Sequence, residues 1–155
     1  MDTIESLIER YSKNRDEYVR PDSDFSETDV RGDFLDPFLN LLGWDVENRS
    51  GKNNRDREVI RESRVNIDES IKKPDYEFRF KTEKKFYLEA KKPCVKIEVD
   101  SKPAFQCRRY GWSGKTAISV LSNFENLFIY DTTSSPTEKD GPEVGRLYKF
   151  HYSEY

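Results

Sequence analysis

The chain has 155 residues, of which 37% are charged and 34% hydrophobic, and its formal net charge is −3. This length is typical of one domain, and 10 Phe, 9 Tyr and 2 Trp supply enough bulky apolar material for a folded core, which excludes a disordered chain. No apolar run reaches the roughly 20 residues of a membrane span, and a single histidine leaves carboxylates as the expected ligands of any metal site.

Charge is distributed unevenly along the chain. Residues 1–70 hold 11 Lys/Arg against 18 Asp/Glu, residues 71–115 hold 13 against 6, and residues 116–155 hold 3 against 6. The net charges of the three segments are therefore −7, +7 and −3. The basic middle segment predicts a surface that attracts a polyanion, with an affinity that falls as salt rises. A basic, solvated surface without a partner is the alternative.

Two helices are expected in the N-terminal third. Apolar residues recur at helical spacing over 3–19. A second helix is expected to begin after Ser26, which forms a capping box with Asp29, and to end at Gly43. Pro37 is expected to kink this helix or divide it. Residues 44–47 are predicted to form the first strand, whereas the polar stretch 49–70 has no clear pattern.

The remaining elements alternate between strands and one helix. The strands are expected at 76–80, 86–91, 117–121, 126–130 and 146–150, and the helix at about 102–112. Residues 81–85 are a polar connection, so the first two strands read as a hairpin. Residues 95–99 alternate as a short strand would, or lead into the helix. The pattern predicts an α/β fold with a central mixed sheet flanked by helices.

The hairpin carries the most informative motif, Pro74-Asp75 followed by Glu89-Ala90-Lys91. Strand side chains alternate, so Glu89 and Lys91 share one face. Pairing of the two strands brings Asp75, at the start of the first, near the end of the second. The alternative is a solvated hairpin with an ordinary cross-strand ion pair.

Two acids and a lysine around one point fit metal-assisted hydrolysis of a phosphodiester. Mg²⁺ prefers oxygen ligands and takes one or two carboxylates together with water and phosphate, and we expect Mn²⁺ to substitute for it. Asp75 and Glu89 are expected to supply the carboxylates, with the backbone carbonyl of Ala90 as a third oxygen. Lys91 is expected to orient the attacking water or to stabilise charge on the phosphate.

The order of these elements resembles the restriction-endonuclease-like PD-(D/E)xK nuclease fold. Two blocks in addition to the hairpin carry the resemblance, which covers roughly residues 26–131. The first is an N-terminal helix block, Glu27-Thr28-Asp29-Val30-Arg31 with Phe34-Leu35-Asp36-Pro37-Phe38-Leu39 and Leu42-Gly43-Trp44-Asp45. The second is a downstream helix–strand block, Gln106-Cys107-Arg108-Arg109-Tyr110-Gly111-Trp112-Ser113 followed by Ser122-Asn123-Phe124-Glu125. They are similar to the nuclease domains of type IIG restriction–modification enzymes and their type I relatives.

The resemblance implies roles for individual residues. Asp75, Glu89 and Lys91 match the catalytic set, and Glu27 matches a first-helix glutamate that reaches the metal. An ordinary i,i+4 ion pair between Glu27 and Arg31 is the alternative.

The downstream helix also matches. Gln106 and Tyr110 match a Gln-x-x-x-Tyr motif that contacts the scissile phosphate or braces Lys91; a surface glutamine and a core tyrosine are the alternative. Arg109, Arg108 and Lys115 are candidates for phosphate contacts, and a solvated helix face is the alternative. Trp44 and Trp112 are expected in the core rather than stacked on bases.

The implied protein is a Mg²⁺-dependent DNA endonuclease of a restriction–modification system. The resemblance implies that the 155 residues are a single nuclease domain at the N-terminus of a longer polypeptide with methyltransferase and target-recognition domains. It also implies double-stranded DNA as substrate, a transient dimer for double-strand cleavage, and a cytoplasmic prokaryotic location. A recombination or junction-resolving nuclease of the same fold and a non-catalytic nucleic-acid-binding module are the other readings.

Overall fold

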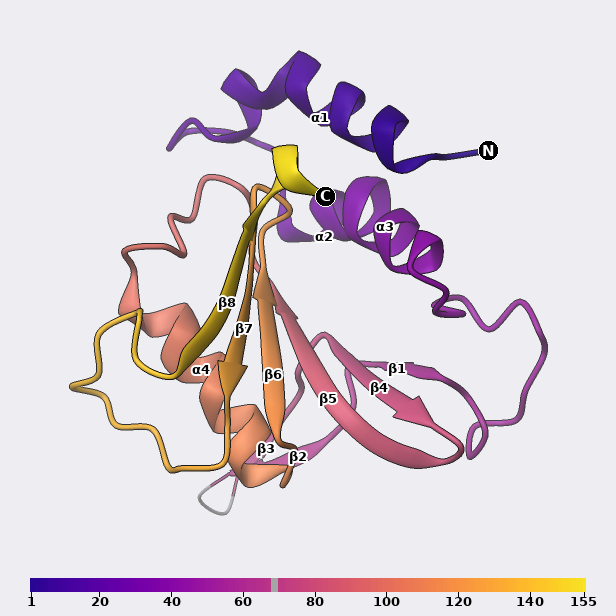
Figure 1. Ribbon diagram of the computed structural model, residues 1–155, viewed down its shortest axis with the longest axis vertical. Coiled ribbons are helices and arrows are strands. Elements are labelled where there is room, and N and C mark those ends of the chain that lie inside the picture. The colour runs from indigo at the N-terminus through magenta and orange to yellow at the C-terminus, as the bar shows by residue number, and fades with distance from the viewer. Residues whose placement is uncertain (68–69) are drawn as a thin grey trace.

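A computed structural model describes residues 1–67 and 70–155 of the chain (Figure 1). The N-terminal helices are α1 (Ile4–Tyr18), α2 (Glu27–Val30) and α3 (Asp36–Leu41), with a π-helical turn, Arg31–Leu35, joining the last two. The expected capping box is confirmed, because the Ser26 hydroxyl accepts from the backbone N–H of Asp29 and the Asp29 carboxylate accepts from that of Ser26. The π-helical turn divides the second helix just before Pro37, and the chain continues as α3 beyond the proline.

A six-stranded sheet forms the centre of the fold. Its strands are β1 (Val59–Arg61), β4 (Tyr76–Phe80), β5 (Glu83–Ala90), β6 (Ile118–Ser122), β7 (Asn126–Asp131) and β8 (Arg146–His151), in the order β1-β4-β5-β6-β7-β8. Among the strand pairs of the described residues only β5–β6 is parallel, and α4 (Ser101–Ser113) makes the crossover between these two strands. The short strands β2 (Val65–Ile67) and β3 (Ser70–Lys72) form a separate antiparallel pair, and a 3₁₀ turn, Tyr152–Glu154, follows β8.

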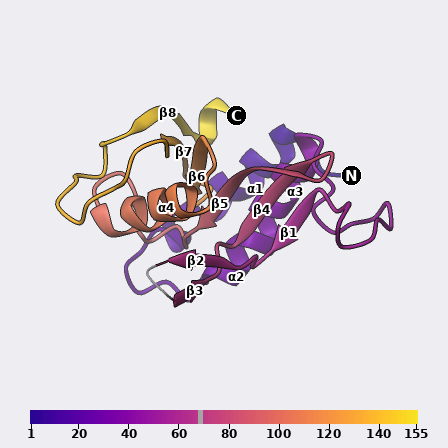
Figure 2. The same ribbon diagram turned by 90° about the horizontal axis from the view of Figure 1, so that it is seen from below.

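The two faces of the sheet bury different sets of side chains. Leu88 and Ala90 of β5 point into an aromatic-rich core with the N-terminal helices, whereas Leu121 of β6 packs with Ala104 and Cys107 of α4. The N-terminal helices and α4 accordingly lie on different sides of the sheet (Figure 2). This arrangement confirms the expected α/β fold with a mixed sheet flanked by helices, and it is consistent with a restriction-endonuclease-like fold.

The prediction of a strand at residues 44–47 is wrong. These residues form a loop whose backbone is satisfied by side chains: the N–H of Asp45 donates to the Glu58 carboxylate at 3.0 Å and that of Val46 to Asn40 Oδ1 at 3.2 Å. Val46 is 1% exposed, so the alternation that resembled a strand reflects one buried anchor. Residues 95–99 likewise form turns that lead into α4.

The polar stretch 49–70, which had no clear pattern, contains β1 and β2 and the first residue of β3. Residues 68–69 of this stretch lie outside the described residues.

The β4–β5 hairpin is tighter than the polar connection implied. β5 begins at Glu83, so the turn is only Lys81-Thr82, and both residues have positive φ (49° and 69°) as a type I′ turn requires. Tyr76 pairs with Leu88 across the hairpin. Continuing this register places Asp75 directly opposite Glu89, where Cβ atoms are about 4.5–5.5 Å apart.

Candidate active site

Three carboxylates meet at the open end of the β4–β5 hairpin. Glu27 is the first residue of α2, Asp75 directly precedes β4, and Glu89 is the second-last residue of β5. One oxygen atom from each lies within 4.8 Å of the others. We call these three residues the acidic cluster.

Asp75 has a hydrogen-bond partner at each of its carboxylate oxygens. It is 8% exposed, its Oδ2 accepts from the backbone N–H of Ala90 at 2.7 Å, and its Oδ1 accepts from Nη1 of Arg31 at 3.1 Å. Burial raises the pKa of Asp75, although the Ala90 N–H and the Arg31 and Lys91 charges oppose the shift. Burial, followed by the charge of Asp75, likewise raises the pKa of Glu27.

Glu89 is the least satisfied member. It is 5% exposed, its Oε1 lies 3.5 Å from Nζ of Lys91, and its Oε2 is buried without a hydrogen-bond partner. Burial, with the Asp75 charge second, raises the pKa of Glu89 to about 8. A buried orphan oxygen normally has an unseen partner. Beside two further carboxylates, the fitting partner is a hard divalent cation, which prefers oxygen ligands.

Lys91 is held at the edge of the acidic cluster by α4. Its backbone N–H donates to the carbonyl of Ser122 at 3.0 Å, and its Nζ donates to Oε1 of Gln106 at 3.0 Å. Nε2 of Gln106 in turn donates to the Tyr110 hydroxyl at 3.1 Å. Burial, then the Glu89 charge, raises the pKa of Tyr110 to about 12, so this hydroxyl stays protonated. Gln106 and Tyr110 therefore form a brace behind Lys91.

Arg31 also belongs to this site, and the sequence reasoning missed its partner. Its ion pair is with Asp75, 44 residues away along the chain, and not the i,i+4 pair with Glu27. The guanidinium also lies over the ring of Tyr76, 4.9 Å from the centroid. Helical spacing was the available signal, because a residue one turn after Glu27 faces the same side.

Other candidate residues lie elsewhere. Arg109 lies over the ring of Phe105, 5.3 Å from the centroid, so its phosphate contact stays a prediction. Arg108 is 4% exposed and donates to Asp140 at 2.7 Å, so the expected phosphate contact for it is wrong.

The two tryptophans differ in their surroundings. Trp44 packs edge-on against Phe78 and Phe86 as expected of a core residue. Trp112 is 45% exposed, so the expected core position is wrong.

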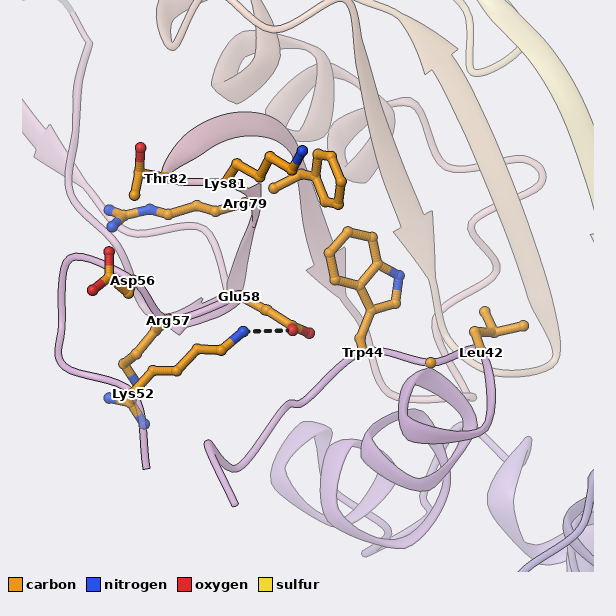
Figure 3. Close-up of a pocket in the computed structure, with 11 residues that line it drawn as sticks. Leu42, Trp44, Lys52, Asp56, Arg57, Glu58, Arg79, Lys81 and Thr82 are labelled. Carbon is orange, nitrogen blue, oxygen red and sulfur yellow. Dashed lines mark hydrogen bonds and ion pairs between the residues drawn. The ribbon is translucent and has the colours of Figure 1, made fainter. Parts of the chain in front are cut away.

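A hollow lies at the other end of the hairpin. It has a volume of about 660 Å³ and lies between the hairpin tip, with Lys81 and Thr82, and the loop that follows α3 (Figure 3). Trp44 faces it, and an ion pair of 2.9 Å between Lys52 and Glu58 crosses its wall. None of its lining residues belongs to the acidic cluster.

Comparison with known proteins gives one informative relative. The chain is 43% identical over 155 residues to the type II restriction enzyme and methyltransferase RM.Eco57I of Escherichia coli. The match covers 99% of this chain but only 15% of that protein. No protein-family model and no solved structure matches the chain. Within the described part of the chain, no helix is both long and apolar enough to cross a bilayer.

Proposed function

We propose that this chain is a divalent-cation-dependent DNA endonuclease domain of a restriction system. The observation that carries the proposal is the convergence of Glu27, Asp75 and Glu89 beside Lys91, with a carboxylate oxygen buried and unpaired. Extensive identity to a restriction enzyme and methyltransferase supports the substrate, double-stranded DNA. A binding module alone has no use for two buried acids and a half-buried third placed where a phosphate must approach.

The acidic cluster is the proposed cation site. Asp75 and Glu89 present the ligand oxygens, and Glu27 closes the site from α2. The N–H of Ala90 points toward Asp75, and the N–H and C=O of one strand residue point to the same edge, so the Ala90 carbonyl is directed to this side as well. When bound, Mg²⁺ or Mn²⁺ polarises the scissile phosphate and makes water a better nucleophile.

Lys91 is the proposed catalytic cation of the chain itself. Held by Gln106 at 3.0 Å, its ammonium donates to the attacking water or to the phosphate oxygen on which charge builds. The water oxygen forms the new P–O bond while the bond to the leaving sugar oxygen breaks. The water loses a proton to solvent, and the leaving oxygen takes one from solvent to become a hydroxyl. No covalent enzyme intermediate forms.

The partners follow from the relative and from the charge pattern. The basic segment 71–115 contains the hairpin and α4, so DNA is drawn toward the site. We propose that methyltransferase and target-recognition functions lie in the same polypeptide, as the name of the relative states for methylation. One acidic cluster cuts one strand, so cleavage of both strands requires a second copy, at least transiently.

Titration with Mg²⁺ or Mn²⁺ by calorimetry separates this proposal from a non-catalytic binding module. We expect the domain to bind a divalent cation and to lose that binding in Asp75→Ala. The matched control is Glu83→Ala, which removes an exposed acid at the other end of β5. Equal cation affinity in wild type, Asp75→Ala and Glu83→Ala would show that the acidic cluster is not the cation site.

A further inference from the structure

Arg31 occupies the position of a counter-ion in the acidic cluster. Its Nη1 lies 3.1 Å from Oδ1 of Asp75, and its Nη2 lies 3.5 Å from the carbonyl of the same residue. The other oxygen of Asp75 is committed to the Ala90 N–H at 2.7 Å. Oδ1 is therefore the oxygen that Asp75 has left for a cation, and the guanidinium already holds it.

The guanidinium is mounted so that it can leave Asp75 without losing its support. It lies over the Tyr76 ring, and its Nε is 3.4 Å from the Tyr76 hydroxyl. Its Nη1 is also 3.9 Å from Oε1 of Glu62, a side chain that is 61% exposed. Arg31 itself is only 18% exposed in its side chain. A small rotation thus exchanges a buried carboxylate for an exposed one while the ring contact remains.

We propose that Arg31 is a built-in competitor of the divalent cation, which releases Oδ1 of Asp75 when the cation binds. This inference rests on the proposed function. A guanidinium cannot be deprotonated in a protein, so Arg31 keeps one positive charge beside the cluster at every working pH. Two cations a few ångströms apart repel, so cation binding drives Arg31 toward Glu62 or toward a substrate phosphate.

The consequence is a site whose cation and phosphate binding are coupled. A displaced guanidinium has a fork geometry that suits a phosphate. Substrate therefore gives the displaced Arg31 a better partner than Glu62, and the cation is held more firmly once DNA is present. Arg31 therefore competes with the cation in the free protein and is a candidate phosphate ligand once DNA is bound.

The test compares cation affinity in wild type, Arg31→Gln and Arg61→Gln by calorimetry with Mn²⁺ in the absence of DNA. Arg61→Gln is the matched control, because Arg61 pairs with Asp36 at 2.7 Å and shares the neighbourhood of Tyr76, yet no bond joins it to Asp75. We expect Arg31→Gln to bind the cation about tenfold more tightly and the control to stay within about twofold of wild type.

A second measurement uses the unmodified side chain. The Nε–Hε signal of Arg31 in a ¹⁵N spectrum, assigned by its loss in Arg31→Lys, should shift during Mg²⁺ titration with the midpoint of cation binding. It remains decisive if Arg31→Gln does not fold.

Three outcomes overturn the inference. Wild-type binding with equal or weaker affinity in Arg31→Gln, or an unmoved Arg31 signal, overturns it and leaves the proposed function standing. Absence of cation binding in both wild type and Arg31→Gln overturns both.

Discussion

The acidic cluster places three carboxylates together at residues that are mostly buried, an arrangement that opposes folding when all three are ionised. Glu89 illustrates this cost most clearly, because its Oε2 has no partner and its pKa is raised to about 8. Such a group holds its proton in the folded chain at a pH where the unfolded chain has lost it. Residues that fit a ligand better than they fit the fold are typical of functional sites.

A pH prediction follows for Glu89. A carboxyl whose pKa is higher in the folded state binds more protons there, so stability is greatest below its unfolded pKa and falls as pH rises toward 8. In EDTA, Glu89→Gln should therefore be more stable than wild type at pH 9, by about 1–3 kcal/mol, and nearly equal at pH 5. Urea unfolding at both values measures this, and a gain that is larger at pH 5 would contradict it.

Gln106 gives a second prediction at this scale. Gln106→Ala removes the acceptor that holds Nζ of Lys91 at 3.0 Å, so cleavage should slow by about 10–100-fold, as for other supporting residues. Cation affinity should stay within about twofold, because Gln106 touches no carboxylate of the cluster. Tyr110→Phe should have a smaller effect in the same direction. Cleavage kinetics beside calorimetry measure both, and parallel losses of rate and affinity would contradict the role of a brace.

At the scale of elements, the site depends on how closely α4 approaches the sheet. Gly111 lies where a Cβ would stand 2.5 Å from Oγ of Ser119 and from Cβ of Thr132. Because Gln106 and Tyr110 are on the same helix, this contact sets the distance from their brace to Lys91. The hairpin sets the position of the carboxylates, because its register places Asp75 opposite Glu89.

Substitution of Gly111 tests this packing. Gly111→Ala should destabilise the domain by about 1–3 kcal/mol, because the added methyl group overlaps two side chains of the sheet layer. Gly32→Ala is the control, since a Cβ there meets nothing within 4 Å, and it should be neutral or stabilise by up to about 1 kcal/mol. Urea midpoints give both values. Equal midpoints for the two variants would show that α4 does not rest on the sheet at Gly111.

At the scale of the whole molecule, local patterns predicted the parts of the fold that depend on local chemistry. Alternation gave the hairpin and the shared face of Glu89 and Lys91, and capping gave the start of α2 at Ser26. Strand order and the parallel β5–β6 pair lie beyond such patterns, because they depend on contacts between distant segments.

The errors have the same origin. Residues 44–47 resemble a strand locally, but side chains from Asn40 and Glu58 take their N–H groups. The partner of Arg31 was not predicted, because an i,i+4 pair with Glu27 was only the alternative, and tertiary structure brings Asp75 within 3.1 Å. Trp112 was assigned to the core by its size, although it lies on the outer side of α4. For Asp45 and Arg31 the deciding partners, Glu58 and Asp75, lie outside the segment in which the pattern was read.

The central claim is that the acidic cluster and Lys91 cut DNA. The most direct measurement is nicking of supercoiled plasmid by the full polypeptide and by this domain, in Mg²⁺ or Mn²⁺ and in EDTA. Asp75→Ala and Lys91→Ala are compared with wild type, and Glu83→Ala and Lys85→Ala serve as controls on the same hairpin. We expect cation-dependent nicking by wild type and both controls and its loss in the two site variants. Equal nicking by all five proteins, or undiminished nicking in EDTA, would contradict it.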